Sequence, residues 1–315
     1  MARILEFLKY LLMPPRKVHE FGGFIELIRE KKKLVILTTK HCLFIADLLV
    51  DSLEKLNIKA DVILNKPKWG YSDLPHIVIC PQIFKYLPNN YIAFQMEQSE
   101  SSNWFTEEYL KKLNSSVAVF DYSLVNVGYL KKQLANPAKV FYLPISINRS
   151  YMGKFSNEFP TRNYDIVFYG DDKSQRRKKI LDILKSKYRV KIVNGVFGTA
   201  LYKELSDAKL VVNIHYYENA LLETTRLYEC LSLSNNIIIS ERGRDQDQHK
   251  YLENMIDFVD DGDVEGLVSK IDYYIKDSDL INKKLANNKS VLASTDVTEF
   301  EHSLKKILRY SGYDS

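Results

Sequence analysis

Glu223, Arg226 and Glu229 recur at the spacing of one helix face in a segment that otherwise looks buried. Positions three and six residues apart lie close to one side of a helix. The helix is predicted between two apolar strands, at residues 210–214 and 236–240, which are typical of a parallel sheet. Its charges gather in the first two turns, beside the C-terminal end of a strand, where open α/β sheets bind ligands. Two carboxylates and a guanidinium at that place predict a site for a polar ligand.

A second polar loop follows the strand predicted over residues 165–169 and opens a helix with a basic run. Gly170 permits a tight turn, and Ser174 has the side chain of a helix N-cap. A helix N-terminus with arginines beside it suits a diphosphate, because the free N–H groups, the dipole and the guanidiniums all attract anions. Arg176 and Arg177 are the candidates for that contact. The alternative is that the run forms a solvated basic helix face.

Three more positions in the same half follow predicted strands. Asn194 and Gly195 come after a strand at residues 190–193, and His215 follows the strand that ends at residue 214. Glycine lets the backbone approach a planar ligand such as a nucleobase. The same residues also suit a plain strand-to-helix loop. His215 is either a ligand contact or a histidine whose ring is satisfied at the strand end.

The first half offers three candidates for a general base. His41, Glu97 and Asp121 each stand at or just after the C-terminal end of a predicted strand. Burial can tune each of them toward neutrality, so that it takes a proton from an acceptor hydroxyl. The alternative for each is an ordinary loop or capping residue.

The order of elements predicts an α/β protein with two doubly wound, Rossmann-like domains that face a cleft. Apolar runs alternate with helical patterns in both halves of the 315 residues. Residues 144–163 break the alternation and are predicted to link the domains. We therefore expect domains at residues 1–150 and 151–315, with the last helix packing back on the first domain.

The composition is that of an ordinary globular protein, with 45% hydrophobic and 27% charged residues. A net charge of +5 is too small to predict a nucleic-acid partner. The chain has neither a GxGxxG nor a GxxxxGK[ST] loop, which disfavours classical dinucleotide oxidoreductases and P-loop NTPases. Cys42, Cys80 and Cys230 are far apart in sequence and predict no disulfide framework and no zinc site. We expect reduced, buried cysteines in a cytoplasmic protein.

Residues 1–17 carry an apolar stripe interrupted by charges and closed by two prolines. The charges and the lack of a small-residue cleavage site argue against a signal peptide. No apolar run in the chain reaches the ~18 residues that span a bilayer. The segment predicts either a helix on the membrane surface, peripheral at its inner face, or a helix docked on the protein's own body.

The sequence N-I-H, a polar loop and a helix with E-x-x-R-x-x-E resemble the donor-nucleotide half of GT-B glycosyltransferases. The resemblance is closest to the group 1 superfamily and its CgeB-like branch. It implies that Glu229 accepts hydrogen bonds from the nucleotide ribose and that Arg226 approaches the diphosphate. It also implies that Glu223 or Glu218 faces the donor sugar. The first glutamate of the retaining pattern would fall on Leu221, so inversion or retention stays open.

The resemblance covers residues 164–275 closely and the first half only in architecture. It implies a glycosyltransferase that moves a sugar from a nucleotide-sugar donor to a hydroxyl of a glycan or lipid-linked acceptor, in surface polysaccharide synthesis. The second domain would hold the donor and the first the acceptor. The alternatives are a non-catalytic two-domain protein that binds a nucleotide or sugar, and another two-domain nucleotide-sugar enzyme such as an epimerase.

We expect no permanently bound cofactor and no metal. Two Asp-x-Asp pairs, which start at Asp245 and Asp261, mimic a metal-binding motif. In the GT-B fold that the resemblance implies, however, a helix dipole and basic side chains take the role that a metal ion has in other fold classes. Ordinary turns are therefore the preferred interpretation of both pairs.

Overall fold

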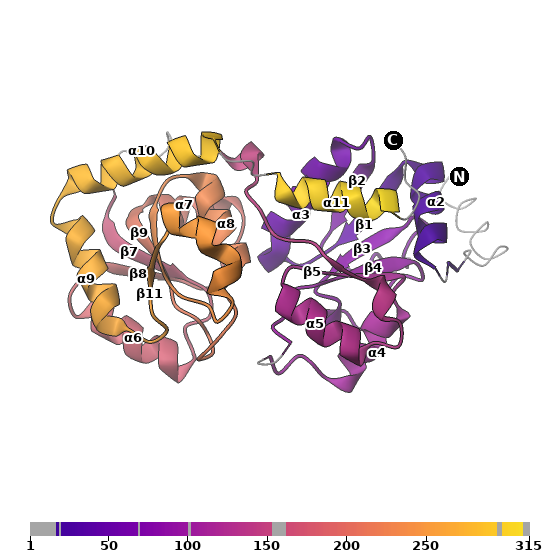
Figure 1. Ribbon diagram of the computed structural model, residues 1–315, viewed down its shortest axis with the longest axis horizontal. Coiled ribbons are helices and arrows are strands. Elements are labelled where there is room, and N and C mark those ends of the chain that lie inside the picture. Colours follow the sequence, from indigo (N-terminus) through magenta and orange to yellow (C-terminus); the bar gives the residue numbers. More distant parts are fainter. Residues whose placement is uncertain are drawn as a thin grey trace. The chain divides into compact units, whose positions relative to one another are not determined.

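The computed structural model of the chain describes residues 17–18, 20–68, 70–99, 102–152, 162–294 and 298–310 (Figure 1). The predicted membrane-surface or docking helix lies almost wholly outside these residues. The chain forms two compact units. Unit 1 contains the residues up to Cys42, Leu49–Pro144 and the residues from Glu301 onward, and unit 2 contains Leu43–Leu48 and Ile145–Phe300.

Unit 1 is built on a six-stranded sheet in which every strand pair is parallel. Its middle strands read as apolar runs because both of their faces are buried. In spatial order the strands are β2 (Lys59–Ile63), β1 (Lys33–Leu37), β3 (His76–Ile79), β4 (Tyr91–Gln95), β5 (Ala118–Asp121) and β6 (Val140–Tyr142). The α-helices that belong to it wholly or in part are α2 (Phe21–Lys31), α3 (Leu43–Glu54), α4 (Glu107–Ser115), α5 (Leu124–Gln133) and α11 (Glu299–Tyr310).

Unit 2 repeats the plan with a five-stranded parallel sheet. In spatial order its strands are β11 (Asp257–Val259), β10 (Ile237–Glu241), β9 (Ala208–Asn213), β7 (Tyr164–Tyr169) and β8 (Val190–Val193). Its helices are α6 (Gln175–Lys185), α7 (Thr199–Ser206), α8 (Thr224–Leu233), α9 (Val264–Ile275) and α10 (Ser278–Ser294). The predicted doubly wound α/β fold is therefore confirmed for both halves of the chain.

Helices cover both faces of the sheet in unit 2. Apolar residues of α6, α9 and α10 share one buried cluster with alternate residues of the central strands, such as Leu210, Val212 and Ile214. Helices α7 and α8 contact β9 and cover the opposite face (Figure 1). Alternation along β9 thus sends one set of side chains to each layer.

Helix starts follow the local rules of the sequence. Thr106 caps α4 by accepting a hydrogen bond from the backbone N–H of Tyr109, and two glutamates occupy the first turn. Ser174 caps α6 in the same way, with Arg177 as the donor residue. None of the helices in the described ranges is both long and apolar enough to cross a membrane.

Candidate functional site

The strand order of unit 2 creates a switch point between β7 and β9. These strands are neighbours in the sheet although β8 lies between them in sequence. Helix α6 connects β7 to β8 on one face of the sheet, and helix α7 connects β8 to β9 on the other face. The loops at the carboxyl ends of β7 and β9 therefore diverge and leave a place for a ligand.

Gly170 follows β7 at this switch point and lies against two guanidinium groups. Its φ of +129° is a conformation that glycine adopts without strain. A Cβ added there would lie 2.7 Å from Nη2 of Arg226 and 3.8 Å from Nη1 of Arg177. The missing side chain at Gly170 is what lets the guanidinium of Arg226 reach the backbone at the end of β7, while that of Arg177 lies at ordinary contact distance.

Arg177 is almost completely buried, with 3% of its side chain exposed. Its Nε donates to the carbonyl oxygen of Ile214 at 2.9 Å, and its Nη1 donates to that of Asp171 at 2.8 Å. Its Nη2 donates to Oε1 of Glu223 at 2.8 Å. Burial lowers the pKa of Arg177 to about 10, so the side chain stays charged at neutral pH. Arg177 thereby ties the loops after β7 and β9 to the start of α8.

Arg226 lies on the first turn of α8, beside the same glutamate. Its Nη1 forms an ion pair with Oε2 of Glu223 and donates to Oδ1 of Asn213 at 2.8 Å. Its guanidinium lies over the ring of Tyr169, 5.1 Å from the centroid. With 16% of its side chain exposed, Arg226 is more open to a ligand than Arg177.

Glu223 stands between the two arginines at the N-cap position of α8, one residue before the helix begins, whereas the sequence predicted it on the helix face itself. Burial alone would raise the pKa of its carboxyl. The charges of Arg226 and Arg177 outweigh burial and hold that pKa below its ordinary value. Glu223 is therefore ionised and fixed by two cations.

Glu229 lies one turn further along α8 and is held by two tyrosines instead. The hydroxyl of Tyr169 donates to its Oε2 at 3.1 Å, and that of Tyr202 donates to its Oε1 at 3.3 Å. Burial raises the pKa of Glu229 to about 7, although both hydroxyl donors work against the rise. A carboxyl of this kind gains from any ligand that donates hydrogen bonds to its charged form.

Arg176 occupies a different place from Arg177. Its Nη1 donates to Oε2 of Glu241 at 2.8 Å and to the carbonyl oxygen of His215 at 2.9 Å. Its Nη2 contacts Asp261 as well as Glu241. Of the two arginine candidates, Arg177 is thus the one beside Gly170 and the α8 charges, whereas Arg176 is engaged by two carboxylates.

His215 and Thr224 are buried polar side chains at the same edge. His215 is 0% exposed and Thr224 is 3% exposed. Within the described part of the chain, neither ring nitrogen of His215 nor the hydroxyl of Thr224 has a hydrogen-bond partner. Burial lowers the pKa of His215, which keeps the imidazole neutral. Unpaired buried polar atoms are costly, so they indicate a place that a ligand completes.

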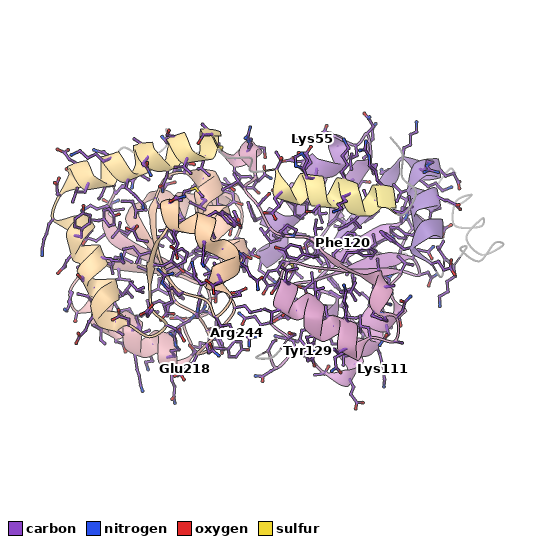
Figure 2. The ribbon with its side chains drawn as sticks, viewed as in Figure 1. Lys55, Lys111, Phe120, Tyr129, Glu218 and Arg244 are labelled. Carbon is purple, nitrogen blue, oxygen red and sulfur yellow. The ribbon has the colours of Figure 1, made fainter. Side chains whose placement is uncertain are left out.

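Asn194 and Gly195 lie in the loop after β8. The amide of Asn194 donates to Asp172 at 3.2 Å and so joins this loop to the one after β7. Gly195 has a φ of +71°, and the space where its side chain would stand is open. Figure 2 labels Glu218 and Arg244, which extend from the loops after β9 and β10 at the same end of unit 2.

The three base candidates of unit 1 lie at the carboxyl edge of its own sheet. The carboxylate of Glu97 accepts hydrogen bonds from Gln82 and Ser102, both at 2.9 Å. Burial raises the pKa of Glu97, while the nearby His41 opposes the rise. The structure thus brings Glu97 and His41 into electrostatic contact.

Asp121 lies deeper, behind the loop that carries Glu97. It is 0% exposed and accepts hydrogen bonds from Gln95 at 2.6 Å, Asn126 at 3.2 Å and the backbone of Ser123 at 2.8 Å. Burial raises its pKa to about 8. Because Gln95 and Asn126 also bind the carbonyl oxygen of Glu97, Asp121 positions that loop.

Comparisons with known proteins show what this arrangement is similar to. No protein-family model matches the chain. One curated relative, the uncharacterized protein L137 of Acanthamoeba polyphaga mimivirus, is 34% identical over 111 residues. That match spans 34% of the chain and 14% of the relative.

Three solved structures cover nearly all of the chain. HepE of Anabaena has a TM-score of 0.55 at 12% identity, over 88% of this chain and 99% of that one. Sucrose-phosphate synthase of Thermosynechococcus elongatus has a TM-score of 0.57 at 10% identity, over 88% and 98%. The glycosyltransferase WaaG has a TM-score of 0.56 at 11% identity, over 89% and 100%. These structures share one architecture of two parallel-sheet α/β domains. The chain has the GT-B fold.

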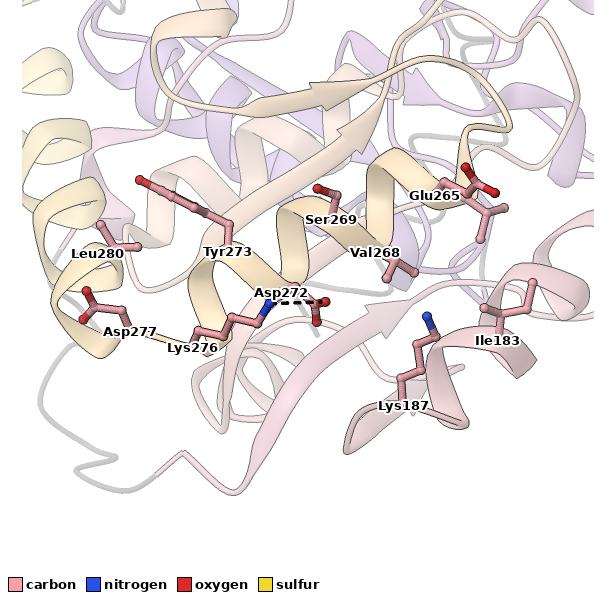
Figure 3. Close-up of a pocket in the computed structure, with 11 residues that line it drawn as sticks. Ile183, Lys187, Glu265, Val268, Ser269, Asp272, Tyr273, Lys276, Asp277 and Leu280 are labelled. Carbon is pink, nitrogen blue, oxygen red and sulfur yellow. Dashed lines mark ion pairs between the residues drawn. The ribbon is translucent and has the colours of Figure 1, made fainter.

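Unit 2 also carries a groove whose lining residues differ from those of the charged cluster at the switch point. Figure 3 shows it on the outer side of α6 and α9, with an ion pair between Asp272 and Lys276 at its rim. Its lining contains none of the residues proposed from the sequence. The groove is lined by Ile183, Lys187, Val264, Glu265, Val268, Ser269, Asp272, Tyr273, Lys276, Asp277 and Leu280.

Proposed function

We propose that this GT-B protein is a glycosyltransferase that moves a sugar from a nucleotide sugar to a hydroxyl of a glycan or lipid-linked acceptor. Unit 2, which corresponds to most of the domain predicted at residues 151–315, binds the donor, and unit 1, which corresponds to most of the domain predicted at residues 1–150, binds the acceptor. One observation carries the proposal. The switch point of unit 2 holds Arg226 and Arg177 against Gly170, with Glu229 one turn away on α8.

The residues divide by the chemistry of a nucleoside diphosphate sugar. Glu229 accepts hydrogen bonds from the ribose hydroxyls, because an ionised carboxylate is a strong acceptor for a diol. Arg226 contacts the diphosphate, supported by Arg177 and by the N-terminus of α8. His215 and Thr224 supply the unpaired buried groups that face the phosphate or the sugar. The loop at Asn194 and Gly195 approaches the base.

Glu223 is proposed to face the donor sugar, with its charge held by both arginines. The solved HepE structures contain UDP, UDP with glucose, and UDP-glucose. UDP-glucose is therefore the first donor to test. WaaG is involved in lipopolysaccharide biosynthesis. By analogy we extend the proposal to surface polysaccharide synthesis.

Glu97 is the proposed general base of unit 1. Its carboxylate is partly buried, is held by two hydrogen bonds and lies at the carboxyl edge of the sheet. His41 assists it electrostatically, and Asp121 fixes its loop. In the transfer, an acceptor hydroxyl passes its proton to Glu97, its oxygen bonds to the anomeric carbon of the donor, and the bond from that carbon to the nucleoside diphosphate breaks.

Transfer is proposed to need no metal. Glu241 and Asp261 are close enough to His215 to form a metal-ligand cluster. The guanidinium of Arg176 already lies between these carboxylates and neutralises them. Asp245 accepts a hydrogen bond from the backbone of Leu222, so it too is engaged in loop structure. Arg226 and Arg177 supply the positive charge for the leaving diphosphate.

The raised pKa of Glu229 predicts that donor affinity rises with pH. Its carboxyl is mostly protonated at about pH 6 and mostly ionised at about pH 8, because its pKa is about 7. Only the ionised form is a full acceptor, so affinity for UDP-glucose should rise about tenfold over that range. UDP-glucose is the suitable ligand because it has no group that titrates there. Isothermal titration calorimetry measures the effect, and the Glu229→Gln protein should show a flat profile.

The decisive assay for the function is release of nucleotide from a nucleotide sugar. The chain should release UDP, and release should accelerate when an acceptor hydroxyl is supplied. A binding protein would hold UDP-glucose without releasing UDP. An epimerase would convert the sugar while the nucleotide stayed attached. If a panel of nucleotide sugars gave binding or sugar conversion without nucleotide release, the transferase proposal would be wrong.

A further inference from the structure

The switch point of unit 1 holds two cysteines that the proposed transfer does not use, beside His41. Strands β1 and β3 are neighbours in the sheet with β2 outside them, so their carboxyl ends form the counterpart of the β7–β9 switch point. The short helix η1 (Lys40–Cys42) follows β1, and Cys80 follows β3 as the N-cap of η2 (Pro81–Ile83). Two cysteines 38 residues apart in sequence thereby meet at one sheet edge.

The donor atoms are close enough to share one ion. The two sulfurs are 3.5 Å apart, and the ring of His41 hydrogen-bonds the thiol of Cys80. One ligand atom from each of His41, Cys42 and Cys80 lies within 4.8 Å of the other two. Tetrahedral zinc with Zn–S bonds of about 2.3 Å places two sulfurs ~3.8 Å apart. The observed distance between the sulfurs is close to this ~3.8 Å and far from the ~2.05 Å of a disulfide bond.

The backbone at Cys80 is in a conformation that a cysteine rarely adopts. Its φ and ψ are 56° and 59°, in the left-handed region. A glycine would adopt this conformation without strain. The backbone strain at Cys80 therefore accompanies the placement of a thiol at this position. Backbone strain of this kind is typical of functional sites.

Burial and exposure also suit a metal site. Cys42 and Cys80 are 5% and 2% exposed, whereas His41 is an exposed residue. The sulfurs are therefore shielded, and the histidine side gives an ion a way in. The hydroxyl of Thr39 contacts Nδ1 of His41 at 2.8 Å, which is the kind of second hydrogen bond that orients a metal-bound imidazole.

We propose that Cys42, Cys80 and His41 bind a thiophilic divalent metal ion, with zinc as the expected species. Two thiolates and an imidazole are the ligand set that selects zinc over magnesium or calcium. The two thiols lose their protons as the ion binds. Three protein ligands leave a fourth position of the tetrahedron for an oxygen ligand. The ion ties the loop after β1 to the loop after β3, and Gln82 of η2 in turn binds the carboxylate of Glu97.

Cobalt titration of the full-length, reduced protein tests the site, because tetrahedral cobalt bound by thiolates has a charge-transfer band and intense visible bands. The wild-type protein should bind one equivalent of cobalt with both signatures, and zinc should displace it. Cys42→Ser and Cys80→Gly should lose the charge-transfer band. Cys80→Gly relieves the left-handed strain, so it keeps the fold while it removes the sulfur.

Cys230→Ser is the matched control, because Cys230 is equally buried but lies in unit 2. This variant should keep the cobalt spectrum of the wild-type protein. Circular dichroism of each variant checks its fold. The proposal is overturned if the reduced wild-type protein gives no thiolate–cobalt band, or if Cys80→Gly keeps it. Formation of a Cys42–Cys80 disulfide by a protein that binds no metal when reduced would also overturn it.

Discussion

Replacing Arg226 with alanine is expected to weaken binding of UDP by at least about 30-fold. Arg226 joins Glu223, Asn213 and the ring of Tyr169 in one partly buried charge network. In the proposed complex, Arg226 and the diphosphate of UDP form a buried, hydrogen-bonded charge pair. Removing one member of such a pair costs about 2–5 kcal/mol of binding free energy. A loss of 2 kcal/mol corresponds to about 30-fold in affinity. Isothermal titration calorimetry with UDP measures the change.

Arg189→Ala is the control for Arg226→Ala. Arg189 pairs with Asp165 at the start of the strands, at the opposite edge of the same sheet. Its loss should leave UDP affinity within about twofold of the wild-type value, because the exposed guanidinium of Arg189 is screened by solvent and touches no ligand. If both alanine variants bound UDP equally well, Arg226 would have no role in binding the diphosphate.

Arg177→Ala is expected to lower the free energy of unfolding of unit 2 by about 3–5 kcal/mol. The change removes all three donors that Arg177 uses, toward Ile214, Asp171 and Glu223. It leaves the carboxylate of Glu223 buried with a single cation. Urea unfolding followed by far-ultraviolet circular dichroism measures the loss. The sequence has no tryptophan between residues 145 and 300, and Trp104 lies in unit 1, so tryptophan fluorescence follows that unit separately.

Lys178→Ala is the matched control on the same helix. Lys178 is exposed, one position after Arg177, so its truncation should change stability by less than about 0.5 kcal/mol. The fluorescence transition of unit 1 should be unchanged in both variants. A loss of under 1 kcal/mol in Arg177→Ala would contradict the role of Arg177 as the buried link between the two loops and α8.

The α/β alternation was predictable because buried parallel strands are apolar throughout. Strand β9 lies within a few residues of its predicted bounds, and helix α8 lies between the two strands as predicted. Helix α2 was not predicted. Two glycines at its start, Gly22 and Gly23, weaken the helical pattern, and burial of Phe24, Ile25 and Ile28 stabilises the helix instead. Packing that decides an element in this way is not visible in a local sequence window.

The donor-site residues were predictable where a side chain directly follows a strand. They were less predictable where the role of a side chain depends on a contact with a residue that is distant in sequence. Spacing alone placed Arg226 and Glu229 on one helix and both arginine candidates on α6. It did not separate Arg176 from Arg177, because Glu241 and Asp261 reach Arg176 from other strands. Thr224 and Tyr202 were missed. A threonine at a helix start reads as an ordinary polar residue, and Tyr202 is adjacent to Glu229 only in the fold.

The same limit applied to the cysteines. Cys42 and Cys80 are too far apart in sequence for any metal-binding spacing, and they predicted no site. The parallel pairing of β1 with β3 brings them together. The ligand set that we propose therefore combines residues at the carboxyl ends of two adjacent strands, a neighbourhood that sequence spacing does not reveal.

The most direct test of the donor site is a binding cycle between Glu229 and the ribose. Calorimetry would compare UDP with 2′-deoxy-UDP on the wild-type protein and on Glu229→Ala. A hydrogen bond to a charged group contributes about 1.5–3 kcal/mol, so the wild-type protein should prefer UDP by about 10- to 150-fold. Glu229→Ala should bind both ligands with affinities within about twofold of each other. An undiminished preference in Glu229→Ala would contradict the ribose contact on which the donor site rests.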